Sequence, residues 1–363
     1  MATRPAGRGA AKRRVAVLWY KRGVMHVRKL LAPLAPWAAL FRLPNLATAA
    51  GDAVAGGSLA LATAGGAPPA GAVRAVFTAA VLEFLLYLGG LADNDLCDME
   101  ADRACGKPRP LATGALSPRR VRIARAVCFL AGPAAVLLNV GRGPALYPWF
   151  LATLATAAAI LLYNRIKEDF PAVGRLLMGS CRGLALAAGF AAGASAYPPG
   201  TFFNRAAMLP LAAAAAGWTL YVAAVTRLGE REETAGAPLG PARLLPWLFA
   251  VLPFAPHVAA LADGSAFAGG PAPAVAALAA ASCALAAATT WIAATLPLGR
   301  PHGPGDRGRA VGRTIGGLLW MQTGLALCGA PGCSVRPAFA AFAAACWCFR
   351  GVVRHFAPAM TGS

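Results

Sequence analysis

Ten long apolar stretches separated by short polar segments dominate the sequence. Each is close to the roughly 20 residues that an α-helix needs to cross a hydrocarbon core of roughly 30 Å. They are rich in Ala and Leu and lack the alternating polar and apolar positions of membrane β-barrel strands. The pattern predicts an all-α fold, a polytopic membrane bundle of nine to ten transmembrane helices, over residues 34–62, 72–92, 121–141, 144–163, 171–195, 206–226, 244–262, 272–298, 311–329 and 335–353.

Composition agrees with a membrane protein, since 58% of the 363 residues are hydrophobic and only 13% are charged. Soluble domains carry about 25% charged residues. The formal net charge of +20 does not indicate a nucleic-acid partner, because Lys and Arg are spread over alternate loops rather than gathered on one basic domain. Basic loops stay on the cytoplasmic side of a membrane, so this alternation predicts the topology.

The chain divides into a basic N-terminal tail, residues 1–33, and one membrane domain, residues 34–356. The first 51 residues contain no Asp or Glu, which fits either a cytoplasmic tail or an organelle transit segment. We therefore expect a multi-pass integral membrane protein, of a bacterial inner membrane or an organelle membrane.

Five of the 14 acidic residues lie within ten positions at the end of the second apolar stretch: Asp93, Asp95, Asp98, Glu100 and Asp102. Asp95, Asp98 and Asp102 are spaced i, i+3 and i+7, which places them on one face of a helix. Three like charges on one face need a counter-cation, and Mg²⁺ prefers such oxygen ligands. The alternative is a solvated acidic loop without a ligand.

Basic residues follow the acidic cluster directly. Arg103, Lys107 and Arg109 could neutralise and orient a diphosphate that Mg²⁺ bridges to the carboxylates. Carboxylates that can bind a metal ion and basic groups that can bind phosphate lie within one short segment, which favours a diphosphate site over a solvated loop.

The segment from Asn94 to Ser117, NDLCDMEADRACGKPRPLATGALS, resembles the first aspartate-rich signature of the UbiA superfamily of intramembrane prenyltransferases. In that family the motif NDxxDxxxD binds Mg²⁺ and, through it, a polyprenyl diphosphate. The resemblance implies that Asp95, Asp98 and Asp102 are catalytic metal ligands, that Asn94 binds the diphosphate, and that a lipophilic acceptor receives the prenyl group.

Further matches extend the resemblance along the chain. Tyr163 and Lys167, in LLYNRIKE, resemble a family element whose Lys contacts the diphosphate. Arg182 lies in a small-residue pattern that is similar to the fifth helix, although it could equally serve as an interhelical hydrogen-bonding residue. Arg42, Asn45 and Asp52, in FRLPNLATAAGDAVAG, resemble the first-helix pattern, most closely that of EboC-like members, although Arg42 could also extend to the membrane surface. The resemblance implies that Lys167 is catalytic and that the substrate is bound by Tyr163, Arg182, Arg42 and Asn45.

The second family motif, DxxxD, is altered. The best register places Thr226 at the first Asp and Glu230 at the second, so that Glu230 is expected to be the surviving metal ligand. Glu232 or Glu233 could compensate, or the loop could be a solvated turn. The departure points to a divergent, EboC-like branch. It also keeps a second function open, a non-catalytic membrane protein that binds or translocates an isoprenoid or lipidic precursor.

Overall fold

The computed structural model describes residues 32–64, 67–69, 71–140, 147–198, 200–202, 204–230, 236–268, 271–303, 305–328 and 336–361. Helices make up nearly all of this part of the chain, with one isolated bridge between Gly236 and His302. The all-α prediction is confirmed. Most of the expected N-terminal tail, residues 1–31, lies outside the described residues.

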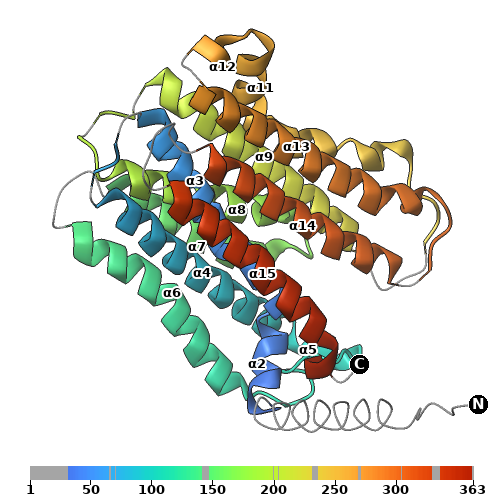
Figure 1. The fold of residues 1–363 in the computed structure, drawn as a ribbon. Coiled ribbons are helices and arrows are strands. Elements are labelled where there is room, and N and C mark those ends of the chain that lie inside the picture. Colours follow the sequence, from blue (N-terminus) through green and yellow to red (C-terminus); the bar gives the residue numbers. More distant parts are fainter. Residues whose placement is uncertain are drawn as a thin grey trace, which may run out of the picture.

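The helices form one bundle, in which α3 and α8 are central and α6 lies at the edge (Figure 1). In chain order they are η1 (Ala32–Leu34), α2 (Ala35–Leu40), η2 (Leu43–Thr48), α3 (Ala49–Ala64), α4 (Ala72–Cys97), α5 (Met99–Ala104), α6 (Pro118–Val140), α7 (Tyr147–Ile166), α8 (Pro171–Ala194), α9 (Arg205–Gly229), η4 (Pro241–Leu244), α10 (Trp247–Val251), η5 (Leu252–Phe254), α11 (Ala255–Ala262), α12 (Ser265–Ala268), α13 (Pro271–Thr295), η6 (Leu296–Gly299), α14 (Asp306–Leu327) and α15 (Arg336–Thr361).

Seven of the described helical segments are long and apolar enough to cross a membrane, and the protein is an integral membrane protein. The helix α3, with 16 residues, is shorter than this criterion, and α15 contributes only a shorter apolar section, Pro337–Val353. The expected count of nine to ten spans therefore stays a prediction.

Glycines bring α3 and α8 into close contact at the centre of the bundle. A Cβ atom on Gly56 would lie 1.8 Å from the carbonyl oxygen of Leu186, and one on Gly189 would lie 1.9 Å from that of Ala53. Small residues permit such backbone approach between membrane helices. These two helices therefore form a tightly packed centre against which the site is built.

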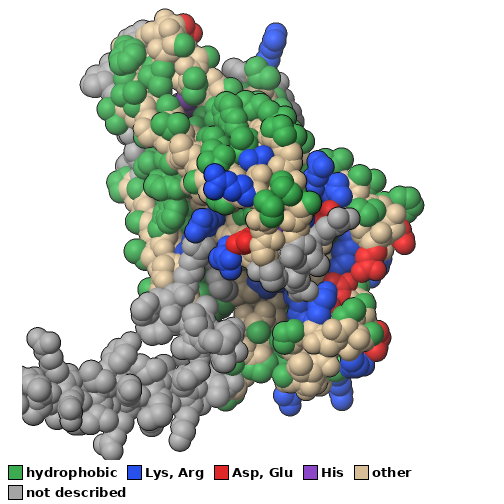
Figure 2. Space-filling view, turned by 90° about the vertical axis from the view of Figure 1, so that its right-hand side faces the viewer, with side chains coloured by type: hydrophobic (Ala, Val, Ile, Leu, Met, Phe, Trp, Pro, Cys, Tyr) green, Lys and Arg blue, Asp and Glu red, His purple; other side chains and the backbone are tan. Residues whose placement is uncertain are grey.

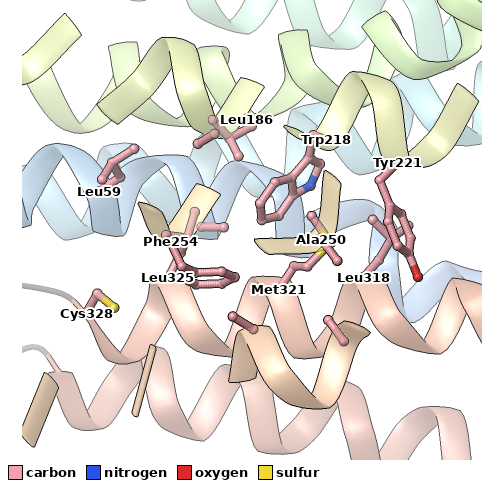
Figure 3. Packing of buried hydrophobic residues seen from close by; sticks show 14 of the residues in the cluster. Leu59, Leu186, Trp218, Tyr221, Ala250, Phe254, Leu318, Met321, Leu325 and Cys328 are labelled. Atoms are coloured by element: carbon pink, nitrogen blue, oxygen red, sulfur yellow. The ribbon is translucent and has the colours of Figure 1, made fainter. Parts of the chain in front are cut away.

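A second packed region joins α9 to α14 through η5 (Figure 3). Trp218, Phe254 and Met321 are fully buried there, and Tyr221 donates a hydrogen bond to the carbonyl oxygen of Thr314 at 2.7 Å. This packing fixes the indole of Trp218, whose polar edge reaches the site described below.

Two of the expected spans are not single continuous helices, although the second, as Pro241–Ala262, is one of the seven described segments long and apolar enough to cross a membrane. The stretch 34–62 is not one helix, because the chain turns at Arg42, whose φ of 45° is left-handed, and restarts as η2 before α3. Pro44 lies in the first turn of η2, where its missing N–H costs no helical hydrogen bond. The stretch 244–262 consists of short pieces, η4, α10, η5 and α11, since prolines at 246, 253 and 256 interrupt it.

Basic side chains gather on one end of the bundle, the right-hand side of Figure 1. Figure 2 faces this end and shows Lys and Arg among hydrophobic side chains. The end of α4 meets the end of α7 here through Asp98 and Lys167, and the start of α8 meets the end of α9 through Arg175 and Glu230. Both predicted acidic motifs therefore lie at the same end of the bundle.

Candidate functional site

A cavity of about 270 Å³ runs between α3, α4, α7 and α8. One stripe of α4 lines it, with side chains from successive turns facing the same way. The stripe consists of Glu83, Tyr87, Gly90, Leu91, Asn94 and Asp98. The end near Asp98 is called the mouth below, and the end near Glu83 is called the deep end.

Lys167 organises the mouth. Its ammonium donates to Asn94 Oδ1 at 2.8 Å and to Asp98 Oδ2 at 2.7 Å, and Asn94 in turn donates to Asp98 at 3.0 Å. Tyr163 lines the cavity one turn before, with its ring centre 5.8 Å from the ammonium. The structure thus brings together four residues that the sequence predicted as parts of one site.

Asp95 lies behind the mouth and meets two arginines. Arg109 approaches its Oδ1 at 3.5 Å and Arg42 at 3.9 Å, and both arginines line the cavity. The left-handed turn at Arg42 is therefore part of the site, because it directs this side chain toward α4. Asp95 is only 2% exposed, and its second oxygen, Oδ2, has no hydrogen-bond partner among the described residues.

The remaining charges of the motif face other directions. The helix is interrupted at Asp98, and Asp102, on α5, pairs with Lys107 at 3.2 Å outside the cavity lining. Arg103 pairs with Glu100 at 3.0 Å on the exposed surface. The three aspartates of the predicted face consequently meet three separate sets of cations.

Asp93 has a structural role, although it belongs to the same acidic cluster. It is fully buried on the side of α6 and α7, where Arg125 donates to it at 2.7 Å and Asn164 at 2.9 Å. This carboxylate ties three helices together at the edge of the site.

The donor set at the mouth fits a hard divalent cation. Asn94 and Asp98 line the mouth, whereas Asp95 lies behind it and is not part of the cavity lining. The ligand atoms of all three side chains are oxygens, and Asp95 Oδ2 is buried without a partner within the described residues. No group of three His, Cys, Asp or Glu side chains converges on one point within the described ranges. Mg²⁺ is commonly held by one or two carboxylates together with water and substrate phosphates, so such a group is not required.

The deep end contains a buried ion pair between Asp52 and Arg182, of which only Arg182 was a predicted site residue. Arg182 contacts Asp52 Oδ2 at 2.6 Å and donates to the carbonyl oxygen of Thr48 at 2.6 Å. Trp218 and Gln322 donate to Asp52 Oδ1 at 2.9 and 2.6 Å. Arg182 lines the cavity, yet its charge is already neutralised, and its predicted contact with a diphosphate stays a prediction.

Glu83 was not among the predicted site residues. It is 3% exposed, lines the cavity, and neither carboxylate oxygen has a hydrogen-bond partner in the described part of the chain. The hydroxyls of Thr153 and Thr156 are the polar groups nearest to it. Thr156 donates to the carbonyl oxygen of Ala152, and the Thr153 hydroxyl, like the carboxylate, is not within hydrogen-bond distance of a partner among the described residues. Its position in the sequence could have identified Glu83, since its spacing places it on the same helical face as Asn94 and Asp98.

Glu230 and Asn45 do not line the cavity. Glu230 accepts two hydrogen bonds from Arg175, at 2.5 and 2.9 Å, and the hydroxyl of Thr226 donates to the carbonyl oxygen of Val222. Asn45 lies in η2, where its carbonyl oxygen accepts a hydrogen bond from Thr48. The metal role of Glu230 stays a prediction, and Glu232 and Glu233 lie outside the described residues.

Comparison with known proteins places these observations in a family. Residues 53–298 match the model of the UbiA prenyltransferase family. No curated protein matches the chain in sequence. The chain is similar to the apo structure of a UbiA homologue from Aeropyrum pernix K1, with 19% identity, a TM-score of 0.53, and coverage of 78% of this chain and 97% of that chain.

A second solved structure is that of a digeranylgeranylglyceryl phosphate synthase in membranes. It is 16% identical, with a TM-score of 0.49 and coverage of 81% of this chain and 98% of that chain.

Proposed function

The chain belongs to the UbiA prenyltransferase family, and we propose that it transfers a prenyl group from a polyprenyl diphosphate to a lipophilic acceptor inside the membrane, with Mg²⁺. The family supports prenyl transfer in general. The finer proposal is carried by the mouth of the cavity, where Lys167 joins Asn94 and Asp98 at the border between basic loops and an apolar interior.

The mouth suits a diphosphate because its charges are exchangeable. Lys167, Arg109 and Arg42 are bound to carboxylates, yet Arg109 and Arg42 keep 35% and 38% of their side-chain surface exposed. Phosphate oxygens accept charge-assisted hydrogen bonds from such groups. Asn94, Asp95 and Asp98 would hold Mg²⁺, which supplies positive charge to a diphosphate leaving group.

The interior suits the organic part of the reaction. Leu91, Ile160, Met178 and Ala185 line the cavity between the mouth and the deep end. When the bond between the allylic carbon and the diphosphate oxygen breaks, water would compete with the acceptor for that carbon. An apolar lining excludes water and favours the bond to the acceptor.

One observation favours the second candidate function, binding or translocation of an isoprenoid or lipidic precursor without chemistry. In the described part of the second motif, the carboxylate of Glu230, directly after α9, is engaged by Arg175, and Thr226, in the last turn of α9, has no carboxylate. The same departure from the second motif is our reason to propose an EboC-like branch.

The test is a product assay. Membranes containing the protein are incubated with Mg²⁺ and labelled prenyl diphosphates of several chain lengths, and lipid products are separated by chromatography. We expect a prenylated lipid that is absent with EDTA and in the Asp98→Asn variant. Tight, Mg²⁺-dependent binding of the diphosphate without any product would instead identify the non-catalytic function.

A further inference from the structure

Glu83 is the least compensated polar group of the cavity. A carboxyl group that is 3% exposed and has no hydrogen-bond partner for either oxygen, within the described residues, is costly to bury. Native structures rarely leave such groups without a partner, and an exception calls for an explanation such as a ligand.

The deep end has no cation to spare for Glu83. Arg182 is the basic residue that lines this end, and its guanidinium is bound by Asp52 and by the carbonyl oxygen of Thr48. Asp52 also accepts hydrogen bonds from Trp218 and Gln322, which fix it in place. A ligand group at the deep end therefore meets a neutralised ion pair and one uncompensated carboxyl group.

Glu83 is also distant from the diphosphate end. Asn94 follows it by eleven positions in one continuous helix, which corresponds to about 16 Å along the axis. Tyr87, Gly90 and Leu91 occupy the same face between them. The carboxyl group of Glu83 consequently cannot contact a diphosphate that is bound by Asn94, Asp98 and Lys167.

We propose that the deep end binds a polar group of the acceptor, and that this group is a hydrogen-bond donor, a hydroxyl or an amine, which Glu83 recognises. The proposal rests on the proposed function, because it takes the cavity as the site of prenyl transfer. Glu83 is then a specificity-determining residue, and the acceptor class excludes molecules that must place a carboxylate or a phosphate at this end.

The test uses three small probes that share one ring and differ in their polar group: benzyl alcohol, benzylamine and benzoate. Their binding to the purified full-length protein is measured by saturation-transfer NMR and calorimetry. We expect the alcohol and the amine to bind and benzoate not to bind. Glu83→Met should weaken binding of both about two- to tenfold, the loss expected for one hydrogen bond.

Asp93→Asn is the matched control, since Asp93 is a buried carboxylate of the same helix that faces away from the cavity. It should leave probe binding unchanged and lower the melting temperature, because it breaks the contact with Arg125. Glu83→Met should raise the melting temperature, because it removes an uncompensated buried carboxyl group. Glu83→Gln keeps the shape and covers the case in which the Met variant does not fold; it should weaken benzylamine binding about tenfold.

Benzoate binding as tight as that of benzyl alcohol would overturn the proposal, as would unchanged probe binding in both Glu83 variants. A separate titration with geranylgeranyl diphosphate and Mg²⁺ distinguishes this failure from that of the proposed function. If the parent protein binds all three probes equally but still binds the diphosphate, only the proposed acceptor class is refuted. Absence of diphosphate binding in the parent refutes the proposed function itself.

Discussion

The two ends of the cavity hold their charges in different ways. At the mouth, the pair of Lys167 and Asp98 is partly exposed, at 16% and 22% of side-chain surface, and Arg42 and Arg109 are exposed further. At the deep end, Asp52 is fully buried, with one oxygen facing Arg182 and the other accepting two hydrogen bonds. Both ends contain carboxylates and arginines, so composition does not distinguish them.

The two ends differ in the solvent exposure of their ion pairs and in the number of hydrogen bonds that each carboxylate accepts, and these differences determine whether an end can exchange its partners for a ligand. A solvent-exposed ion pair contributes little to stability, typically 0 to about 1 kcal/mol. The pairs of the mouth are partly exposed, so their partners can be exchanged for ligand charges at a smaller cost than those of a fully buried pair. A buried pair with additional hydrogen bonds is strongly destabilised when one partner is removed. We infer that the mouth is built for ligand exchange, and that the pair of Asp52 and Arg182 is built for rigidity.

The largest expected effect is on the mouth. Asp98→Asn should weaken Mg²⁺-dependent diphosphate binding at least about 100-fold, because even residues beside metal ligands typically contribute 10- to 100-fold. The melting temperature should change little. Calorimetry with geranylgeranyl diphosphate, with and without EDTA, is the measurement. Glu100→Gln is the control, since Glu100 lies in the same motif but is 74% exposed; equal effects of the two changes would contradict a metal site at Asp98.

At the deep end the same kind of change should affect stability instead. Asp52→Asn should lower the free energy of unfolding by about 3 to 5 kcal/mol, because it leaves the buried Arg182 without its counter-charge. Unfolding in detergent, followed by circular dichroism, measures this difference. Asp306→Asn breaks an exposed pair with Arg309 and should leave the free energy of unfolding nearly unchanged. A comparable cost in both variants would remove the distinction between the two ends.

A third change tests the basic side of the mouth. Lys167→Met should weaken diphosphate binding about 10- to 100-fold, because it removes charge-assisted hydrogen bonds, while the apolar stem of the side chain is kept. Arg119→Gln removes an exposed positive charge that does not line the cavity and should have no more than about a twofold effect. Similar losses in both variants would indicate only a general attraction of the basic face.

The sequence predicted the fold and the mouth because both depend on local patterns. Apolar stretches of spanning length specify membrane helices directly, and the motif around Asn94 and Asp98 lies on one such helix. Lys167 was also predicted, and it meets Asp98 across 69 positions, since α4 and α7 end at the same face of the bundle.

The deep end could not be predicted in the same way, because its contacts join distant parts of the chain. Asp52 meets Gln322 across 270 positions and Trp218 across 166 positions. No local pattern encodes such pairings. An ionisable residue inside an apolar stretch is nevertheless a functional candidate by itself, so that Asp52 and Glu83 could have been included on that ground. The turn at Arg42 was missed because the apolar residues on both sides of it were taken as one span, although Pro44 is a helix-breaking signal at this place.

The smallest expected effect concerns the second motif, formed by Thr226 at the end of α9 and Glu230 directly after it. Unlike Asp98 at the mouth, Glu230 does not line the cavity, and its carboxylate is paired with Arg175. Because Arg175 offsets its charge, a metal role of Glu230 should be weaker than that of Asp98. If Glu230 has this role, Thr226→Asp restores two carboxylates at i and i+4. It should then tighten Mg²⁺-dependent diphosphate binding about two- to fivefold, the range of a single exposed charge interaction. Glu230→Gln should weaken binding by a similar factor. Thr226→Asn, which introduces nearly the same shape without the charge, is the control. Unchanged affinity in both the Thr226→Asp and the Glu230→Gln variants would mean that Glu230 only binds Arg175. A single acidic motif would then remain to hold the cation. That result would favour the second candidate function, binding or translocation without chemistry.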